Sequence, residues 1–166
     1  MVLYLTIWYL TLWFQVMKTA GQKAETTGQL IHSMLELRDE LRQFMQKKFK
    51  ENQVDLTYEM HQVMACLWRK DGINQQEIAD LTLRDKAGIT FLIDNLSKRD
   101  LVKRQEDPND RRSKLIYLTA KGKKLGQKVE PWVKELFILA GSSIDAATLK
   151  SCMATIEQMR DRVKGV

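Results

Sequence analysis

The chain has few of the residues that build disulfides, metal sites or linkers. Its 166 residues include two cysteines, two histidines and two prolines. Two cysteines far apart in the sequence, Cys66 and Cys152, do not suggest a disulfide framework, which favours a reducing, cytoplasmic location. His32 and His61 lack the clustered spacing of a tetrahedral metal site, and no nucleophile–base pair is evident. The sequence therefore predicts no metal, no cofactor and no enzymatic activity.

With so little proline and glycine, there is no clear linker, and the length predicts a single domain over 18–166. Segment 1–17 differs, because it carries no charge and is dense in aromatic and aliphatic residues. As a helix it would span about 25 Å, short of a roughly 30 Å hydrocarbon core, and it lacks the basic flank of a signal peptide. We interpret it as an N-terminal extension. A membrane anchor is the less favoured alternative.

Positive charge is concentrated in one part of the chain. Residues 84–128 contain 13 Lys or Arg and 6 Asp or Glu, a net charge of +7, whereas the whole chain carries +6. The rest of the chain is therefore close to neutral. Charge gathered in one segment predicts a surface that binds a polyanion.

Apolar spacing predicts several helices before and within this segment. An amphipathic helix covers 29–51, and a second begins at Thr57 or Tyr58 and ends near Asp71-Gly72, with glycine as a left-handed C-cap. Asn74 caps a short third helix, in which Ile78, Ala79 and Leu81 are predicted to face inward. Thr82 and Leu83 form the turn that follows.

The helix predicted at 85–99, capped by Asp85, completes a helix-turn-helix. Its predicted core side contains Ile89, Leu92, Ile93 and Leu96. The opposite side of this helix contains Lys86, Ala87, Thr90, Phe91, Asp94, Asn95 and Lys98. Arg84, just before the helix, is predicted to contact DNA together with this side. An ordinary solvated face is the alternative, but an exposed aromatic at Phe91 disfavours it. In a major groove, Phe91 would contact a thymine methyl group, while Lys86 and Asn95 would contact base edges or phosphates.

Strands 101–104 and 114–118 predict a hairpin whose tip is the turn Asp107-Pro108-Asn109-Asp110-Arg111-Arg112. Arginines at a hairpin tip suit the negative potential of a minor groove, so Arg111 and Arg112 are predicted to contact DNA. A solvated charged turn is the alternative. The whole pattern predicts a mainly α fold with a small β-hairpin wing, a winged helix-turn-helix lobe over 55–118.

Two further helices follow the hairpin. Thr119 caps a helix that ends at Gly141. The first turns of this helix carry a ridge of lysines that faces phosphate or solvent, and Pro131 should bend the helix near its middle. A last helix begins near Asp145. Their apolar surface exceeds what a small winged helix can cover. We therefore predict that helices 29–51 and 119–165 pair with a second copy of the chain.

The chain from about residue 29 to 163 resembles the MarR family of bacterial transcriptional regulators. The most specific part of the resemblance is 89–125 (ITFLIDNLSKRDLVKRQEDPNDRRSKLIYLTAKGKKL). The family's wing pattern is matched at Asp107, Asp110 and Arg112, although Asn109 replaces its first arginine. The resemblance implies a homodimer that binds a pseudo-palindromic operator on double-stranded DNA. It places Lys86, Gly88 and Thr90 near bases or phosphates, and Asp110 where it orients Arg112.

The resemblance also implies a repressor, relieved in many members by a small phenolic ligand between the dimer helices and the DNA-binding lobe. In this chain the crevice would lie near His32, His61, Met64 and Trp68. The alternative function is a winged-helix module for protein–protein contact, which the excess of basic residues disfavours.

Overall fold

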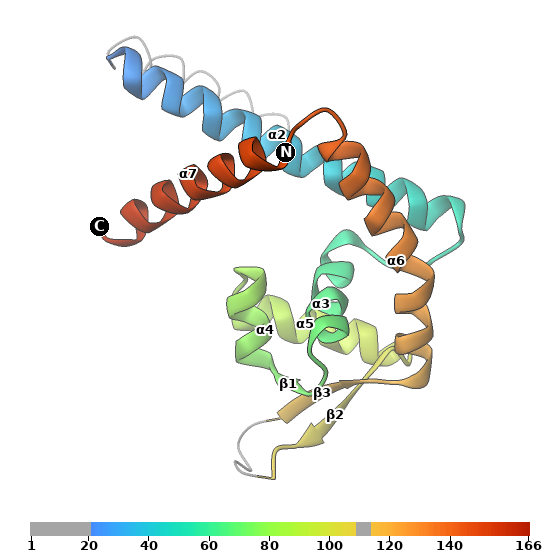
Figure 1. Ribbon diagram of the computed structural model, residues 1–166. Coiled ribbons are helices and arrows are strands. Elements are labelled where there is room, and N and C mark those ends of the chain that lie inside the picture. Colours follow the sequence, from blue (N-terminus) through green and yellow to red (C-terminus); the bar gives the residue numbers. More distant parts are fainter. Residues whose placement is uncertain (1–20, 109–113) are drawn as a thin grey trace, which may run out of the picture. The chain divides into compact units, whose positions relative to one another are not determined.

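The computed structural model describes residues 21–108 and 114–166, so the expectations for segment 1–17 and for Asn109, Asp110, Arg111 and Arg112 at the wing tip lie outside the described residues. The helices are α2 (Gln22–Glu51), α3 (Tyr58–Arg69), α4 (Gln75–Thr82), α5 (Lys86–Lys98), α6 (Ala120–Gly141) and α7 (Ala146–Lys164). The strands are β1 (Ile73–Asn74), β2 (Val102–Glu106) and β3 (Lys114–Leu118). This order confirms the predicted fold class (Figure 1).

Helix α2 begins at Gln22, earlier than the predicted residue 29. The first turns have no apolar stripe, so hydrophobic spacing could not reveal them. Instead, the hydroxyls of Thr26 and Thr27 donate to the carbonyls four residues before them, at 3.0 and 2.8 Å. The helix thus extends beyond its amphipathic part, and these two hydroxyls are satisfied by its own carbonyls.

Contacts within the chain separate residues up to Phe44 from a second unit that begins at Met45. In the first unit α2 exposes four large apolar side chains: Leu30, Ile31, Leu35 and Leu37. In the second unit the end of α2 contributes Met45 and Phe49, which are 1% and 2% exposed. These two side chains mark where α2 enters the core.

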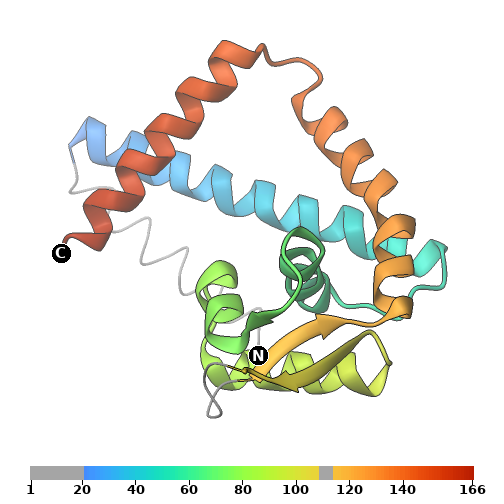
Figure 2. The same ribbon diagram turned by 60° about the horizontal axis from the view of Figure 1, so that its bottom comes forward.

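Helices α3, α4 and α5 contact one another and surround the core of the second unit, beside a short sheet (Figures 1 and 2). The buried side chains of α3 and α5 are Met60, Val63, Met64, Leu67, Ile89, Leu92, Ile93 and Leu96. The inner face predicted for α5 is confirmed. N-caps at Thr57, Asn74 and Asp85 are also confirmed, since each side chain accepts a hydrogen bond from a backbone N–H of the following helix.

The sheet is antiparallel with the order β1-β3-β2. Strand β1 was not predicted, because two residues are too few to show alternation. Its Ile73 lies opposite Ile116 in β3. The predicted C-cap of α3 was wrong: the helix ends at Arg69, Lys70 is the extended cap, and Gly72 instead forms the entry to β1 with φ of 73°.

Leu81 was wrongly assigned to the core, because its side chain is 55% exposed. The half-buried Thr82, four residues after Ile78, takes the inward position, and its hydroxyl donates to the Ile78 carbonyl at 2.7 Å. Leu83 then adopts a left-handed conformation, with φ of 54°, that turns the chain towards α5.

Helix α6 begins at the predicted cap, Thr119, and continues through Pro131 to Gly141. The Thr119 hydroxyl both accepts from the Gly122 N–H at 3.0 Å and donates to the Asp100 carbonyl at 2.6 Å. This pair of bonds ties the start of α6 to the end of α5. Helix α7 begins just after Asp145, close to the predicted start, and Asp145 is its N-cap; the described part of the chain buries no residue of this helix.

Across residues 21–108 and 114–166, no single helix is long and apolar enough to cross a membrane. Helices α6 and α7 reach that length and apolar composition only when taken together, and they are bent by 96° relative to each other.

Candidate nucleic-acid interface

Helix α5 is held by the core on one side and open on the other. Its first turn is fixed by Asp85, whose Oδ1 accepts a hydrogen bond from the Gly88 N–H at 2.7 Å. On the outer side Lys86 and Lys98 are exposed, and Phe91 is 67% exposed. The exposed face therefore presents two cations and an aromatic ring from a rigid helix, as the sequence predicted.

Two predicted contact residues on α5 are engaged within the protein. The Thr90 hydroxyl donates to the Lys86 carbonyl at 2.9 Å and accepts from Gln75 Nε2 of α4 at 3.2 Å. Asn95 Nδ2 donates to the Phe91 carbonyl at 2.9 Å. Both side chains are only half exposed. Thr90 thus links α5 to α4, whereas the bond of Asn95 stays within α5, and both side chains keep part of their surface exposed.

Arg84 precedes α5 and is also positioned by the fold. Its Nη2 donates to Gln62 Oε1 of α3 at 3.0 Å, and the residue remains exposed. An arginine has five N–H donors, so a single neutral partner leaves its charge uncompensated. Arg84 thus lies just before α5 in the chain, with its guanidinium group bonded to α3.

The wing is joined to α5 by an ion pair that the sequence did not reveal. Arg104 Nη2 of β2 lies 2.7 Å from Asp94 Oδ1 of α5. Two exposed lysines on the wing strands, Lys103 and Lys114, were also missed as candidates. Their position in predicted strands next to the basic turn was the available signal. The predicted contacts of the tip arginines lie outside the described residues.

A cavity of about 840 Å³ lies between α3 and α6. Its lining includes His61 and Trp68, two of the four residues predicted to bind a ligand. Met64 is 0% exposed and belongs to the core. His32 lies in the first unit, exposed, with Nε2 3.2 Å from Glu36 Oε1. The structure thus brings two of the predicted residues to this cavity.

His61 is the chemically distinctive group of this cavity. Burial lowers its pKa to about 4, so the imidazole is neutral near pH 7. The rings of Phe49, Tyr58 and Trp68 surround it. Among the described residues its buried Nδ1 has no hydrogen-bond partner. A buried polar atom without a partner is costly, which makes Nδ1 a natural point for a ligand.

Trp68 has its own partner, since Nε1 donates to the Gly122 carbonyl at 3.0 Å. Its ring therefore forms a fixed wall of the cavity. Cys66 is half-buried and burial raises the pKa of its thiol, so it is an inert thiol rather than a nucleophile. No cluster of three metal-ligating side chains occurs in the ranges 21–108 and 114–166.

Comparison with known proteins agrees with this arrangement. The model of the MarR family matches residues 56–114. The transcriptional regulator HosA of Escherichia coli O111:H- is 32% identical over 89 residues, covering 52% of this chain and 66% of HosA. The transcriptional repressor NicR of Pseudomonas putida is 29% identical over 100 residues, covering 60% of this chain and 63% of NicR. The matched part is just under two thirds of each curated relative.

The structure of the S. aureus MepR–DNA complex is similar, with a TM-score of 0.72, 25% identity, and coverage of 79% of this chain and 96% of that chain. A short capped helix, a recognition helix and a strand pair define the fold as a winged helix-turn-helix. The chain belongs to the MarR family. The predicted family is thereby confirmed, and the relatives that match are named as transcriptional regulators, one of them as a repressor.

Proposed function

We propose that the protein is a transcriptional repressor that binds a pseudo-palindromic operator on double-stranded DNA as a homodimer. Helix α5 of each copy enters the major groove, and the wing lies along the minor groove. The observation that carries this proposal is the outer face of α5, where Lys86 and Phe91 project from a helix whose opposite side is locked in the core. The likeness to a DNA-bound relative and to a repressor supports it.

The exposed residues take different roles in this arrangement. Lys86 reaches a guanine edge or a phosphate, and Phe91 packs against a thymine methyl group. Arg84 and Lys98 contact phosphates, which fix the register of the helix without reading sequence. The other proposed contacts come from Gly88, Thr90 and Asn95 on α5 and from Asp110, Arg111 and Arg112 at the wing tip.

A winged-helix module for protein–protein contact is the alternative from another class. The core of a protein interface is depleted of lysine, whereas the surface around α5 and the wing exposes lysines at 86, 98, 103 and 114. Phosphate recognition suits this surface better.

The Lys86→Ala variant tests the major-groove assignment. The operator is first obtained by selecting from random DNA with the wild-type protein. If Lys86 contacts a base, the variant should bind this operator about 1–3 kcal/mol more weakly. If it contacts a phosphate, the slope of log affinity against log salt concentration should fall by about one per recognition helix. Fluorescence anisotropy at several salt concentrations measures both.

Lys150→Ala is the matched control, because Lys150 is exposed on α7 rather than on α5. It should bind the operator as the wild type does. Affinity that does not change with salt, or a Lys86→Ala variant indistinguishable from Lys150→Ala, would contradict the proposal.

The cavity between α3 and α6 is proposed as the effector site. A neutral aromatic hydroxyl compound fits it, since the wall is aromatic and neutral His61 offers Nδ1 as a hydrogen-bond partner. A ligand in this cavity would contact α3, and α3 packs directly against α5. The ligand would therefore act on DNA affinity through the helices that hold α5.

Phenol tests this assignment, and it is expected to lower the operator affinity of the wild-type protein. His61→Leu removes the ring nitrogen and should make DNA binding insensitive to phenol. His32→Leu is the control, since His32 does not line the cavity, and it should keep the response. Anisotropy titrations with and without phenol measure the change. An equal response in wild type and His61→Leu would rule out the proposed contact.

A further inference from the structure

Phe91 is the one large apolar side chain that α5 exposes, and the structure describes this helix over its full length. The other large apolar side chains of α5 are buried. One turn towards the N-terminus, the neighbours of Phe91 are Ala87 and Gly88, the two smallest residues of the helix. Side chains on a helix lean towards its N-terminus. The ring is therefore directed to a turn that has nothing large enough to shield it.

The chain itself gains little from an aromatic ring at this position. An aromatic side chain stabilises a fold by burying its surface, yet Phe91 remains 67% exposed. Phenylalanine also favours a helix less than alanine does. A surface outside the chain explains the ring better than the fold does.

The surroundings of the ring indicate what that outside surface is. A protein partner would need a wider apolar patch, but the other exposed residues of α5 are Lys86, Ala87 and Lys98. Lys98 is seven positions from Phe91 and so lies on the same face of the helix. A single ring beside cations suits an anionic partner that offers a small apolar group.

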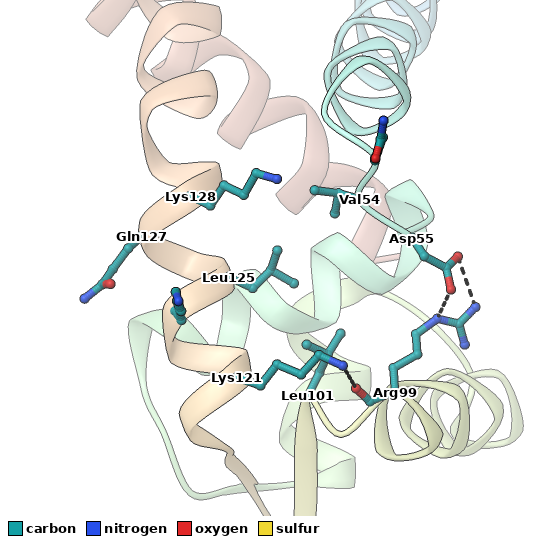
Figure 3. Close-up of a pocket in the computed structure, with 10 residues that line it drawn as sticks. Val54, Asp55, Arg99, Leu101, Lys121, Leu125, Gln127 and Lys128 are labelled. Atoms are coloured by element: carbon teal, nitrogen blue, oxygen red, sulfur yellow. Dashed lines mark hydrogen bonds and ion pairs between the residues drawn. The ribbon is translucent and has the colours of Figure 1, made fainter.

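Helix α5 is held in a fixed position by other elements. Asp94 Oδ1 lies 2.7 Å from Arg104 Nη2 of β2. Just past the helix, Arg99 Nε donates to Asp55 Oδ2 at 2.9 Å, and the Arg99 carbonyl accepts from Lys121 Nζ at 2.8 Å (Figure 3). Recognition of a group as small as one methyl requires such a rigid support.

The chemistry of the ring limits what it can recognise on DNA. A phenyl ring has no hydrogen-bond donor or acceptor, so it cannot read the polar edges of the bases. The apolar feature of the major groove is the C5 methyl group of thymine. 5-Methylcytosine carries the same methyl group on the same carbon, beside an amino group where thymine has a carbonyl oxygen. The ring of Phe91 would contact both methyl groups in the same way.

We propose that Phe91 reads the C5 methyl group of a pyrimidine, so that the affinity of the protein for its operator depends on DNA methylation at that position. The ring prefers thymine to uracil, and 5-methylcytosine to cytosine, by the same factor. One position of the operator is then read by its methyl group and not by its base pair. Because the ring can meet this group only if α5 enters the major groove, this inference rests on the proposed function.

Modified operators test the inference by fluorescence anisotropy. Deoxyuridine replaces the thymines of the selected operator, one symmetric pair at a time. Burying one methyl group raises affinity by about fourfold, so losing both methyl groups of the pair that Phe91 contacts should weaken binding by about fifteenfold. At that same pair, 5-methylcytosine should bind about fifteenfold more tightly than cytosine, with guanine opposite each.

Three variants locate the contact. Phe91→Ala removes the ring from an exposed site, where alanine favours the helix, and it should bind methylated and unmethylated operators equally. Phe91→Leu keeps an apolar side chain and should retain part of the preference. Lys98→Ala loses a proposed phosphate contact, so it should bind every operator more weakly but keep the preference for the methyl group.

Equal affinity for thymine and deoxyuridine at every position would overturn the inference. So would a methyl preference that persists in Phe91→Ala, because another group would then make the contact. Wild-type affinity that falls with salt but ignores methylation would leave the proposed function standing and refute only the role of Phe91. A protein that binds no DNA would overturn both.

Discussion

Replacing Ile138 by lysine is expected to disrupt the proposed dimer and to leave a 19.4 kDa monomer. Ile138 is 73% exposed near the end of α6, beside Phe137 at 66% and Leu139 at 62%. Such a cluster of large apolar side chains marks an interaction surface. A lysine in its centre would have to be buried without a partner if the dimer formed, and this cost opposes association.

Helix α7 supports the same conclusion. A helix gains most of its stability by burying one apolar face, yet the described chain buries no residue of α7. Its exposed apolar residues are Leu149, Met153, Ile156 and Val163. A second copy of the chain would supply the missing cover, as the sequence predicted for helices 119–165.

The mass in solution, measured by light scattering, checks the prediction. Leu81→Lys is the control, because Leu81 is a similarly exposed leucine on α4, outside the proposed dimer surface, and it should remain dimeric. Operator affinity of Ile138→Lys should fall by about a hundredfold or more, since two linked recognition helices gain from effective concentration. An Ile138→Lys protein that keeps twice the monomer mass would disprove this interface.

Features set by local chemistry could be predicted from the sequence. Thr57, Asn74, Asp85 and Thr119 cap helices as predicted, because a short polar side chain can bond the free N–H groups two or three residues later. The 3.6-residue period likewise identified the buried face of α5. What failed was local structure decided by tertiary contacts, such as the two-residue β1 and the outward Leu81.

The candidate DNA-binding surface likewise has features that could be predicted from the sequence and features that could not. The exposure of Lys86 and Phe91 follows from the period of one helix, and was predicted. The bond from Gln75 to Thr90 and the ion pair between Arg104 and Asp94 join different elements, and no local pattern contains them. The lysines at the start of α6 line a cavity together with the loop after α2 and the end of α5. Because these three segments meet only in the folded chain, the sequence showed the lysines merely as a ridge on one helix.

Gly122→Ala is the other change with a large expected effect, and it should lower the free energy of unfolding by at least about 3 kcal/mol. Gly122 is buried in the first turn of α6. A Cβ atom there would overlap the carbonyl oxygen of Leu101, and would lie 3.3 Å from Leu118 Cδ2. The Leu101 carbonyl cannot move freely, because it accepts the Thr119 N–H at 3.1 Å.

Helix propensity alone predicts the opposite sign, since alanine in a helix is favoured over glycine by about 1 kcal/mol. Gly141→Ala at the end of the same helix provides the comparison: its Cβ would meet only Leu149 Cδ1 at 4.0 Å, so this variant should be neutral or slightly more stable. Urea unfolding of both variants measures the difference. If Gly122→Ala were as stable as Gly141→Ala, the close approach of α6 to the Leu101 carbonyl, just before β2, would be incorrect. That approach also fixes the Gly122 carbonyl that holds Trp68 in the effector cavity, so Gly122→Ala should weaken the response to phenol along with stability.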